Sequence, residues 1–353
     1  MITIGGDLRV GRIGYGAMRL TGPDLWGDYP DRDAGIALLR RAVDEGVTLI
    51  DTADVYGPHS NELLIRDALH PYPEHLVIAT KGGFVRGSPD MSTVDAIGNP
   101  NYLRQCAHMS ARRLGVDRID LYYLHSGRAR DASFENQIAT LAQLRKEGLI
   151  GHIGLSNVTP AQLRTAQEIT EIAAVTAYFN VAARQQAPLL DAAVDVGAVF
   201  CPWQPVSLIQ PGVQTDTSGP DALRRVLEPI AARHDATIPQ VALAWLLARS
   251  PAIMPIPATT SIRHLRENLA AQDLALTQEE ITTMEAARQR IPPSAATLTE
   301  AEGGVLLQTR AEHLEGVAMM LAGLGWPFTI RKPASLRGEV RALAGRLHAW
   351  SDA

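Results

Sequence analysis

The stretch EGVTLID, residues 45–51, joins the end of a helical pattern to a short apolar run and shows how this chain is built. A glycine directly after a helix takes the left-handed conformation that ends the helix. The run that follows is apolar on both faces, which is typical of a parallel strand covered by helices. The same pattern returns at residues 114–124, 147–155 and 196–200. The chain therefore alternates helices with buried strands, which predicts a parallel sheet.

Outward from residues 45–51, eight strands alternate with helical segments. The strands are expected at about residues 12–16, 48–51, 76–80, 119–124, 151–155, 173–179, 198–202 and 253–257. The helices are expected near residues 32–45, 61–69, 101–114, 133–146, 160–168, 186–196, 221–234, 238–249 and 262–271. Eight such units in roughly 270 residues predict an α/β fold, a closed (β/α)₈ TIM barrel over residues 1–292. Residues 2–10 predict an N-terminal β-hairpin that closes the bottom of the barrel.

A doubly wound open sheet is the alternative architecture. Its dinucleotide fingerprint requires a third glycine after a Gly-x-Gly pair. Here Gly14 and Gly16 are followed at that position by Arg19. A phosphate-binding loop of the G-x-x-x-x-G-K-[ST] type is also missing from the sequence. These differences favour the barrel.

The composition excludes several classes of protein. Of the 353 residues, 46% are hydrophobic and 20% charged, which are ordinary values for a folded globular chain. The formal net charge of -5 implies no broad basic face, so no nucleic-acid partner is expected. No apolar run approaches about 18 residues and the first residues do not resemble a signal peptide, so no membrane span is expected. Cys106 and Cys201 lie far apart without metal-type spacing, which predicts no metal site and a cytoplasmic location.

The predicted strands carry polar side chains at their C-terminal ends, where TIM barrels hold their sites. The second strand ends in DTADVYG, residues 51–57, and the third ends in Lys81. The fourth ends in His125 and the fifth in Ser156 and Asn157. Neighbouring strands thus bring a carboxylate with a phenol, a lysine and an imidazole to one rim.

This combination suits the reduction of a carbonyl group, in which a hydride reaches carbon and a proton reaches oxygen. A tyrosine has an ordinary pKa of about 10 and donates its proton poorly at neutral pH unless it is helped. The ammonium of Lys81 would lower the pKa of Tyr56, and Asp51 would keep Lys81 charged. His125 would orient the carbonyl oxygen. Each residue alone is more often structural, and their occurrence together on adjacent strand ends is what indicates catalysis.

The chain resembles the aldo-keto reductase family over about residues 8–290. The resemblance is carried by residues 51–57 with Glu62, 80–81, 121–125 and 153–157. Within the family, residues 16–22, 26–27 and 70–73 are most similar to the bacterial pyridoxal-reductase-like members. The resemblance implies a (β/α)₈ barrel, NADPH as the hydride donor, and a catalytic set made of Asp51, Tyr56, Lys81 and His125.

The resemblance also implies which residues bind the cofactor and the substrate. Ser156 and Asn157 match the pair that holds the nicotinamide carboxamide, and Trp203 matches an aromatic residue that stacks on the nicotinamide ring. The start of the eighth helix would add backbone amides for a phosphate. The implied cofactor-binding residues are Met18, Arg19, Ser156, Asn157, Thr176, Trp203, Gln204, Pro205, Ala258, Thr259, Ser261, His264, Glu267 and Asn268. The implied substrate-pocket residues are Trp26, Phe84 and Ser126.

The sequence departs from the family pattern at three places, one of which is that only Arg263 and His264 offer a basic side chain where some members place a lysine or arginine on the 2′-phosphate of the cofactor. Thr176 stands where the family usually has a glutamine that binds the carboxamide, and Ser126 follows His125 where the family often has proline or a charged residue. Aromatic residues at Trp26, Phe84 and Trp203 predict a pocket for a planar or apolar aldehyde such as pyridoxal rather than for a sugar phosphate.

Other functions are weighed against this one. A metal hydrolase needs several His, Asp or Glu at strand ends, and a glycosidase needs two flanking carboxylates. The strand ends supply neither set. The alternative that stays open is an NADPH-binding sensor or partner subunit with little turnover, because some aldo-keto reductase relatives act in this way.

Residues 303–353 predict a small appendage with the order strand, helix, strand, helix. After a linker at residues 291–296, strands are expected at 305–308 and 328–330, and helices from Thr309 and from near Pro333. The run RAEHLEG at residues 310–316 is similar to part of the C-terminal extension of WYL-type bacterial transcription regulators.

That similarity to the WYL-type extension brings no DNA-binding element with it. So small a unit cannot bury all its apolar stripes internally. We therefore expect an interaction or regulatory module in which two tails pair into a four-stranded sheet and a homodimer. A tail folded across its own barrel is the alternative.

Overall fold

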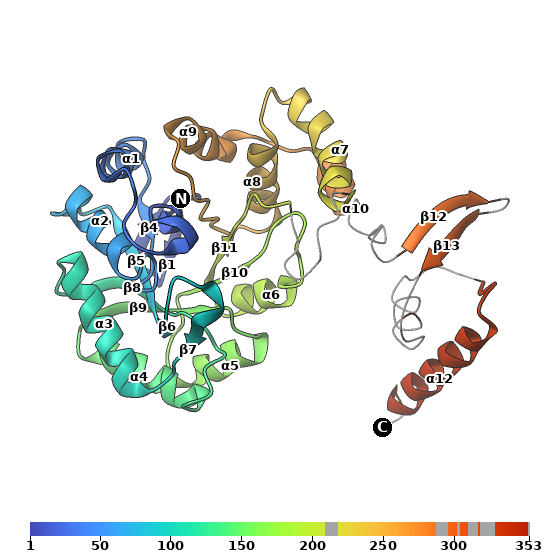
Figure 1. The fold of residues 1–353 in the computed structure, drawn as a ribbon, viewed down its shortest axis with the longest axis horizontal. Helices are drawn as coiled ribbons and strands as arrows, with labels where there is room; N and C mark the ends of the chain where they lie inside the picture. Colours follow the sequence, from blue (N-terminus) through green and yellow to red (C-terminus); the bar gives the residue numbers. More distant parts are fainter. Residues whose placement is uncertain (209–217, 287–295, 302–303, 310–316, 318–328, 352–353) are drawn as a thin grey trace. The chain divides into compact units, whose positions relative to one another are not determined.

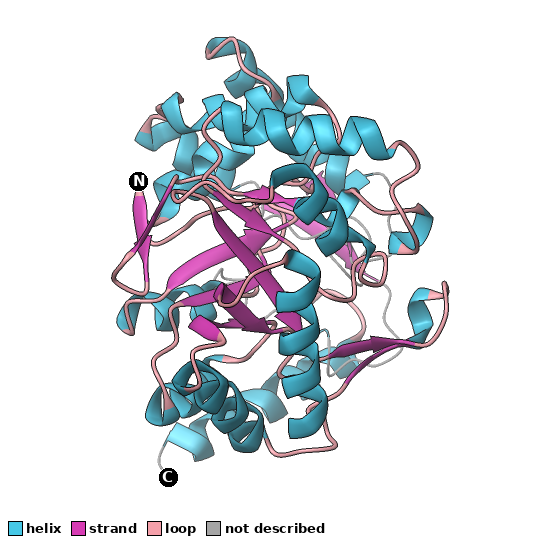
Figure 2. Cartoon of the chain, turned by 90° about the vertical axis from the view of Figure 1, so that its left-hand side faces the viewer, coloured by secondary structure: helices cyan, strands magenta, loops and turns pink. Residues whose placement is uncertain are grey.

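The computed structural model describes residues 1–208, 218–286, 296–301, 304–309, 317 and 329–351. The chain divides into two compact units, Met1–Gln289 and Arg290–Ala353. The first unit is an α/β barrel (Figure 1). Figure 2 shows its strands enclosed by helices. No helix within the described ranges is long and apolar enough to cross a membrane.

Seven parallel strands form the barrel wall, in the order β11-β10-β9-β8-β5-β4-β3. Their bounds are β3 (Tyr15–Gly16), β4 (Leu49–Asp51), β5 (Val77–Gly82), β8 (Ile119–Leu124), β9 (Ile150–Ser156), β10 (Ala174–Tyr178) and β11 (Val199–Trp203). Register is regular between neighbours, since Ile50 of β4 pairs with both Tyr15 of β3 and Ile78 of β5. The predicted barrel is confirmed, although its first strand is shorter than expected.

The predicted eighth strand closes the ring in an irregular form. Met254 and Ile256 donate their N–H groups to β11 carbonyls at 2.9 and 3.2 Å. The carbonyls of Pro255 and Pro257 accept bonds from the backbone at residues 14–16 at 3.0 and 3.1 Å. Because proline has no N–H, this segment can accept but not donate on the β3 side. It therefore joins both neighbours without forming a regular ladder.

Helices cover the outside of the sheet. Their bounds are α1 (Arg32–Asp44), α2 (Ser60–Leu69), α3 (Pro100–Leu114), α4 (Phe134–Lys146), α5 (Pro160–Ile169), α6 (Ala187–Asp195), α7 (Ser218–Arg233), α8 (Ile238–Arg249) and α9 (Ile262–Ala270). These agree with the prediction, and the capping box of Thr159 and Gln162 begins α5 as the sequence indicates. A further helix, α10 (Gln278–Ala286), was not predicted.

The N-terminal hairpin closes the bottom of the barrel. Strands β1 (Ile2–Ile4) and β2 (Leu8–Val10) pair antiparallel. Ile4 and Val10 are fully buried in one apolar cluster with Leu49 and Val77, the first residues of β4 and β5. The hairpin thus fills the end of the barrel opposite the C-terminal ends of the strands, as predicted.

The loops at the other end contain structure that the sequence analysis missed. A hairpin of β6 (Phe84–Arg86) and β7 (Val94–Ala96) follows β5. Short 3₁₀ helices lie there at η1 (Ala17–Arg19), η2 (Pro23–Leu25) and η3 (Met91–Thr93), while a fourth, η4 (Ala271–Asp273), directly follows α9.

The second unit begins with a hairpin rather than a lone strand. β12 (Ala296–Ala301) pairs antiparallel with β13 (Gly304–Thr309), so the expected strand at 305–308 is confirmed but has a partner that was not predicted. The last helix is confirmed as α12 (Ala334–Ser351). Of the helix expected from Thr309, Val317 is helical and the neighbouring residues lie outside the described ranges.

The strand expected at residues 328–330 is wrong for its two described residues. Thr329 and Ile330 belong to no strand. The carbonyl of Ile330 instead accepts two bonds from the guanidinium of Arg337, at 3.1 and 2.7 Å. Thr329 and Ile330 thus lead into α12, and the Arg337 side chain of that helix satisfies the Ile330 carbonyl.

Candidate active site

Three neighbouring strands deliver the predicted catalytic residues to the C-terminal end of the barrel. Asp51 is the last residue of β4, Lys81 lies in β5, and His125 directly follows β8. Their exposed fractions are only 4%, 3% and 6%. Tyr56, in the turn after β4, is half-buried. Four groups that are separate in the sequence therefore share one buried site.

Lys81 is the centre of this site. Its ammonium forms an ion pair with Asp51 and donates a hydrogen bond to the carbonyl of Thr52 at 2.8 Å. The same nitrogen lies 5.2 Å from the ring centroid of Tyr56. The Tyr56 and His125 rings meet edge-on, with centroids 6.0 Å apart. The phenol is therefore flanked by a fixed cation and by an imidazole.

Burial and charge act against each other at Tyr56. Burial raises the pKa of the phenol, while the nearby Lys81 ammonium lowers it, and the net pKa is above its ordinary value. The predicted effect of Lys81 is present, but the predicted lowered pKa is wrong because desolvation outweighs it. Tyr56 therefore keeps its proton at neutral pH and can act as an acid.

His125 is neutral in this environment. Burial, and then the charge of Lys81, lower the pKa of its imidazole well below the ordinary value. Its buried Nδ1 has no hydrogen-bond partner among the described residues. A neutral ring can donate a hydrogen bond to a carbonyl oxygen without adding a second positive charge beside Lys81.

A second cluster lies at the ends of β9 and β11. The indole N–H of Trp203 donates to Oδ1 of Asn157 at 3.3 Å, and Nδ2 of Asn157 donates to Oγ of Ser156 at 2.9 Å. Tyr178, which ends β10, packs edge-on against Trp203 with centroids 4.8 Å apart. The structure thus brings the three predicted residues together, and it adds Tyr178, which the sequence analysis did not single out.

Two predicted contact residues are turned inward. Thr176 is fully buried, and its hydroxyl donates to the carbonyl of Cys201 at 2.7 Å. Its hydroxyl is therefore bonded within the barrel wall, and Tyr178 is the last residue of β10. The cofactor contact of Thr176 stays a prediction. Ser126 is 2% exposed, and its hydroxyl accepts a bond from the Arg128 N–H at 3.2 Å within its own loop.

Ser261 caps the start of α9 by accepting a bond from the His264 N–H at 3.4 Å. The side chain of Arg263 is 77% exposed and lies 3.0 Å from the ring of His264 and 3.6 Å from the carboxylate of Glu267. A capped helix start beside an exposed arginine and histidine suits an anion such as a phosphate.

The other predicted cofactor residues lie around these two clusters. Thr259 and Asn268 are buried, whereas Arg19 is exposed. Tyr15 donates to the Thr259 carbonyl at 2.6 Å and so anchors the segment before α9. Met18 and Ala258 are half-buried and Pro205 is buried, whereas Gln204 is exposed. Gln204 has a φ of 47°, and its carbonyl accepts a bond from Nδ2 of Asn180 at 3.1 Å.

Aromatic side chains border the catalytic groups. The ring of Phe84, at the start of β6, lies 4.5 Å from that of His125 between centroids. The guanidinium of Arg86, two residues on, lies 5.2 Å from the centroid of the Trp26 ring. Phe84 thus reaches the catalytic set as predicted, and Trp26 is held by a residue that the sequence analysis did not identify.

A buried polar network lies behind the catalytic turn. The carboxylate of Glu62 accepts bonds from Thr80 and from Nε of Arg113, both at 2.6 Å. Asp54 is 3% exposed, and its Oδ1 has no partner among the described residues. Burial and the charge of Glu62 raise the pKa of Asp54 to about 7. A cavity of about 320 Å³ adjoins Asp54 and is walled by Phe84 and residues of α3.

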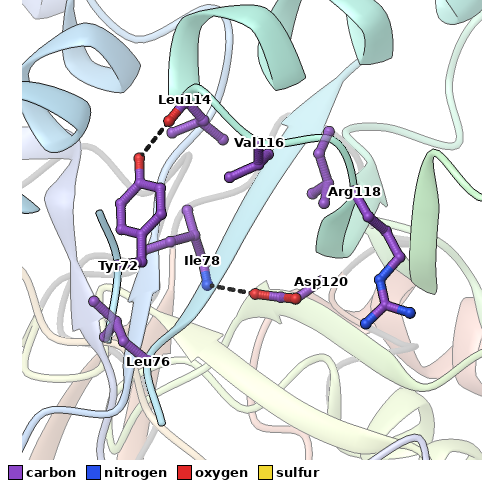
Figure 3. A pocket seen from close by; sticks show the side chains of 8 residues that line it. Tyr72, Leu76, Ile78, Leu114, Val116, Arg118 and Asp120 are labelled. Atoms are coloured by element: carbon purple, nitrogen blue, oxygen red, sulfur yellow. Dashed lines mark hydrogen bonds between the residues drawn. The ribbon is translucent and has the colours of Figure 1, made fainter. Parts of the chain in front are cut away.

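A much smaller hollow lies near the opposite ends of β5 and β8 (Figure 3). Its volume is about 30 Å³, room for little more than one or two waters. Tyr72 donates to the Leu114 carbonyl at 2.8 Å on one side, and Asp120 accepts from the Ile78 N–H at 3.4 Å on the other. It is too small for an organic substrate.

A buried Lys81–Asp51 pair beside a phenol at the C-terminal end of a barrel is an arrangement that suits the reduction of carbonyl groups. The sequence profile of the aldo/keto reductase family matches residues 12–289, and the chain belongs to this family. A WCX domain profile matches residues 273–347. The predicted resemblances of the barrel to aldo-keto reductases and of the tail to the extension of WYL-type regulators are both confirmed.

Several known proteins are similar to this chain. Pyridoxine 4-dehydrogenase of Escherichia coli K12 is 42% identical over 286 residues, which cover 79% of this chain and 96% of that protein. The glycerol dehydrogenase AKR11B4 of Gluconobacter oxydans aligns with a TM-score of 0.73 at 22% identity, over 85% of this chain and 98% of that one. A Klebsiella pneumoniae aldo/keto reductase solved with NADP and acetate aligns with a TM-score of 0.65 at 23% identity, over 80% and 93%.

Proposed function

We propose that this protein reduces an aldehyde or ketone to the alcohol, with NADPH as the hydride donor and Tyr56 as the general acid. The observation that carries the proposal is the buried Lys81–Asp51 pair beside a half-buried phenol and a neutral imidazole. The E. coli relative named pyridoxine 4-dehydrogenase supports the reaction class, and the K. pneumoniae structure with NADP supports the cofactor.

The bound cofactor supplies a hydride to the carbonyl carbon. Tyr56 donates its proton to the carbonyl oxygen, and the phenolate that this leaves is stabilised by the Lys81 ammonium. His125 donates a hydrogen bond that holds the oxygen in place. Tyr56 then regains a proton from solvent, so that the carbonyl, NADPH and one proton become the alcohol and NADP⁺. A general acid in such a step contributes about 10²–10⁴ in rate.

The cofactor is proposed to lie across both clusters described above. Ser156 and Asn157 are placed to bind a carboxamide, and Trp203 is held against them through its indole N–H. Arg263 and His264 at the start of α9 would bind the 2′-phosphate, which favours NADPH over NADH. The residues fit the group, because exposed cations and a capped helix start occur together where the phosphate would lie.

The proposed substrate is a planar aldehyde such as pyridoxal. Phe84 packs on His125, and Trp26 lies in the neighbouring loop, so aromatic faces border the catalytic groups. The name of the E. coli relative points to the same substrate class. NADPH oxidation with pyridoxal, benzaldehyde and erythrose 4-phosphate tests this. A higher kcat/KM for the phosphorylated sugar than for the aromatic aldehydes would contradict the proposal.

The role of Tyr56 is tested with Tyr56→Phe, which keeps the ring and removes the acid. We expect kcat to fall by about 10²–10⁴ while the Kd of NADPH stays within twofold of the wild type. A variant that keeps more than a tenth of the wild-type kcat would show that another group donates the proton.

A second candidate function is that of an NADPH-binding sensor or partner subunit, acting in the cytoplasm. The WCX match at residues 273–347 favours it, because most of this segment lies beyond residue 289, where the match to the aldo/keto reductase profile ends. Tight NADPH binding without turnover on the aldehyde panel would favour this candidate.

We further propose that the C-terminal units pair to form a homodimer. The hairpin of β12 and β13 has only two strands, which is too few for an independent sheet. Light scattering on the full chain and on a chain ending at Arg290 tests this. Two monomers of unchanged activity would refute the dimer.

A further inference from the structure

Arg86 connects two loops at the catalytic end of the barrel. It ends β6, in the hairpin that follows the strand carrying Lys81. Its guanidinium donates to the carbonyl of Leu25 at 2.7 Å and to the carbonyl of Asp24 at 2.5 Å, and it lies over the Trp26 ring at 5.2 Å. One side chain therefore contacts three consecutive residues that lie about 60 positions earlier in the chain.

The same guanidinium also binds its own hairpin. Its Nε donates to the Ser88 carbonyl at 3.2 Å, and Nη2 donates to the Pro89 carbonyl at 2.6 Å. Four backbone carbonyls from two segments thus share one planar group with fixed donor directions. A lysine carries its three N–H donors on one nitrogen at the end of a flexible stem and cannot reproduce this planar, multi-nitrogen pattern.

The segment that Arg86 holds, residues 22–27, is called the strap below. Asp24 and Leu25 have φ values of 53° and 58°, a left-handed conformation that is uncommon outside glycine and strained for leucine. Residues in such a conformation are destabilising by themselves and persist only when the surroundings hold them. The bonds from Arg86 to the carbonyls of these two residues provide such a hold.

The strap also touches the catalytic turn. The Leu25 carbonyl, which accepts from Arg86, also accepts from the N–H of Gly57 at 3.0 Å. Gly57 directly follows Tyr56. The hydroxyl of Ser60 donates to the Gly27 carbonyl at 2.9 Å, which makes a second tie. Displacement of the strap would therefore disturb both Trp26 and the backbone beside Tyr56.

We propose that Arg86 is a positioning residue that sets substrate selectivity, because it fixes the strap and hence Trp26 at the rim of the site. The inference deepens the proposed carbonyl reductase function. It assigns to the Arg86–strap contact the preference for planar aromatic aldehydes over small aliphatic ones. Arg86 is not itself a catalytic residue; it acts through its contact with Trp26 and, by way of the Leu25 carbonyl, through Gly57.

Arg86→Met and Arg86→Lys test the proposal, with Arg32→Met as the control. Arg32, at the start of α1, forms an exposed ion pair with Asp67 of α2, and within the described residues no hydrogen bond joins its side chain to the strap. With NADPH, kcat/KM is measured for benzaldehyde and for propanal. In both Arg86 variants we expect the benzaldehyde-to-propanal ratio to fall at least fivefold, mainly through KM. The Kd of NADPH should stay within twofold of the wild type, and Arg32→Met should match the wild type.

Hydrogen exchange gives a second readout that does not depend on turnover. The Trp26 N–H donates to the Pro23 carbonyl at 3.0 Å, and the Gly57 N–H donates to Leu25 as above. Peptides covering residues 20–30 and 54–62 should exchange at least tenfold faster in both Arg86 variants. An unchanged selectivity ratio with unchanged exchange would overturn the proposal, and so would full rescue by lysine. If the wild type shows no turnover, the proposed function fails, and exchange alone then decides whether Arg86 holds the strap.

Discussion

Replacing Asp54 with asparagine should make the protein more stable at neutral and alkaline pH. Asp54 is almost fully buried, with an unpartnered Oδ1, and its pKa is raised to about 7 by burial and by the charge of Glu62. The single guanidinium of Arg113 is already bonded to Glu62 at 2.6 Å. Other groups facing Asp54 are the Cys106 thiol, to which it is hydrogen-bonded, and the Tyr56 phenol. An ionised Asp54 thus adds a second negative charge that this network does not neutralise.

The sign and size follow from linkage. A carboxyl whose folded pKa lies above its unfolded pKa favours folding most below the unfolded value, and the benefit is lost as pH rises to the folded value. The ordinary value is 3.8 and the folded one about 7. The full difference corresponds to roughly 4 kcal/mol. Most of this loss of stability falls between pH 5 and pH 8, where the free energy of unfolding of the wild type should drop by roughly 3 kcal/mol because of Asp54.

Urea unfolding of both proteins at pH 5, 6, 7 and 8 measures the effect. Asparagine has nearly the same shape but cannot ionise. The free energy of unfolding of Asp54→Asn, minus that of the wild type, should therefore rise steadily with pH and level off above about 7. A difference that stays constant over this range would show that Asp54 is not the titrating group and that the reasoning from burial is wrong.

Two further predictions concern charged groups elsewhere. Lys81→Arg should reduce kcat almost as much as Lys81→Met, because the guanidinium fork cannot replace the compact ammonium between Asp51 and Tyr56; steady-state kinetics that show a fully active arginine variant would contradict this. Glu280→Gln should lower the free energy of unfolding at pH 7 by about 1–3 kcal/mol, measured by urea unfolding. Burial opposes ionisation of Glu280, but hydrogen bonds from His234, from the Thr277 N–H and from Arg233 outweigh burial and lower the pKa of Glu280 to about 2. The stability that the ionised Glu280 contributes should therefore be lost as pH falls from about 4.5 toward 2.

Most of the barrel could be predicted because its signals are local. A glycine after four of the helices, each followed by an apolar run, marks strands without any knowledge of their neighbours. The eighth strand shows the limit of this approach. Its prolines are visible in the sequence. Only the structure shows that the carbonyls of Pro255 and Pro257 still accept hydrogen bonds from the N–H groups of Gly14 and Gly16.

The catalytic set could be predicted for a similar reason, since each member lies at a strand end. The contacts around it could not. Arg86 bonds to Leu25 across 61 positions, and no periodic pattern connects them. Thr176 was selected because it stands where the family usually has a glutamine, and only the structure shows that its hydroxyl turns inward to the Cys201 carbonyl while Tyr178 ends β10.

The pKa of Tyr56 shows why the chemistry could be predicted more easily than its energetics. The sequence shows a lysine next to a phenol, and from charge alone the pKa of the phenol should fall. The structure adds burial, which raises that pKa and outweighs the cation. The two effects serve different steps, because burial keeps the proton on Tyr56 before the reaction, while Lys81 lowers the cost of the phenolate once the proton has left. A general acid needs both, and so the net raised pKa is consistent with the assigned role of Tyr56.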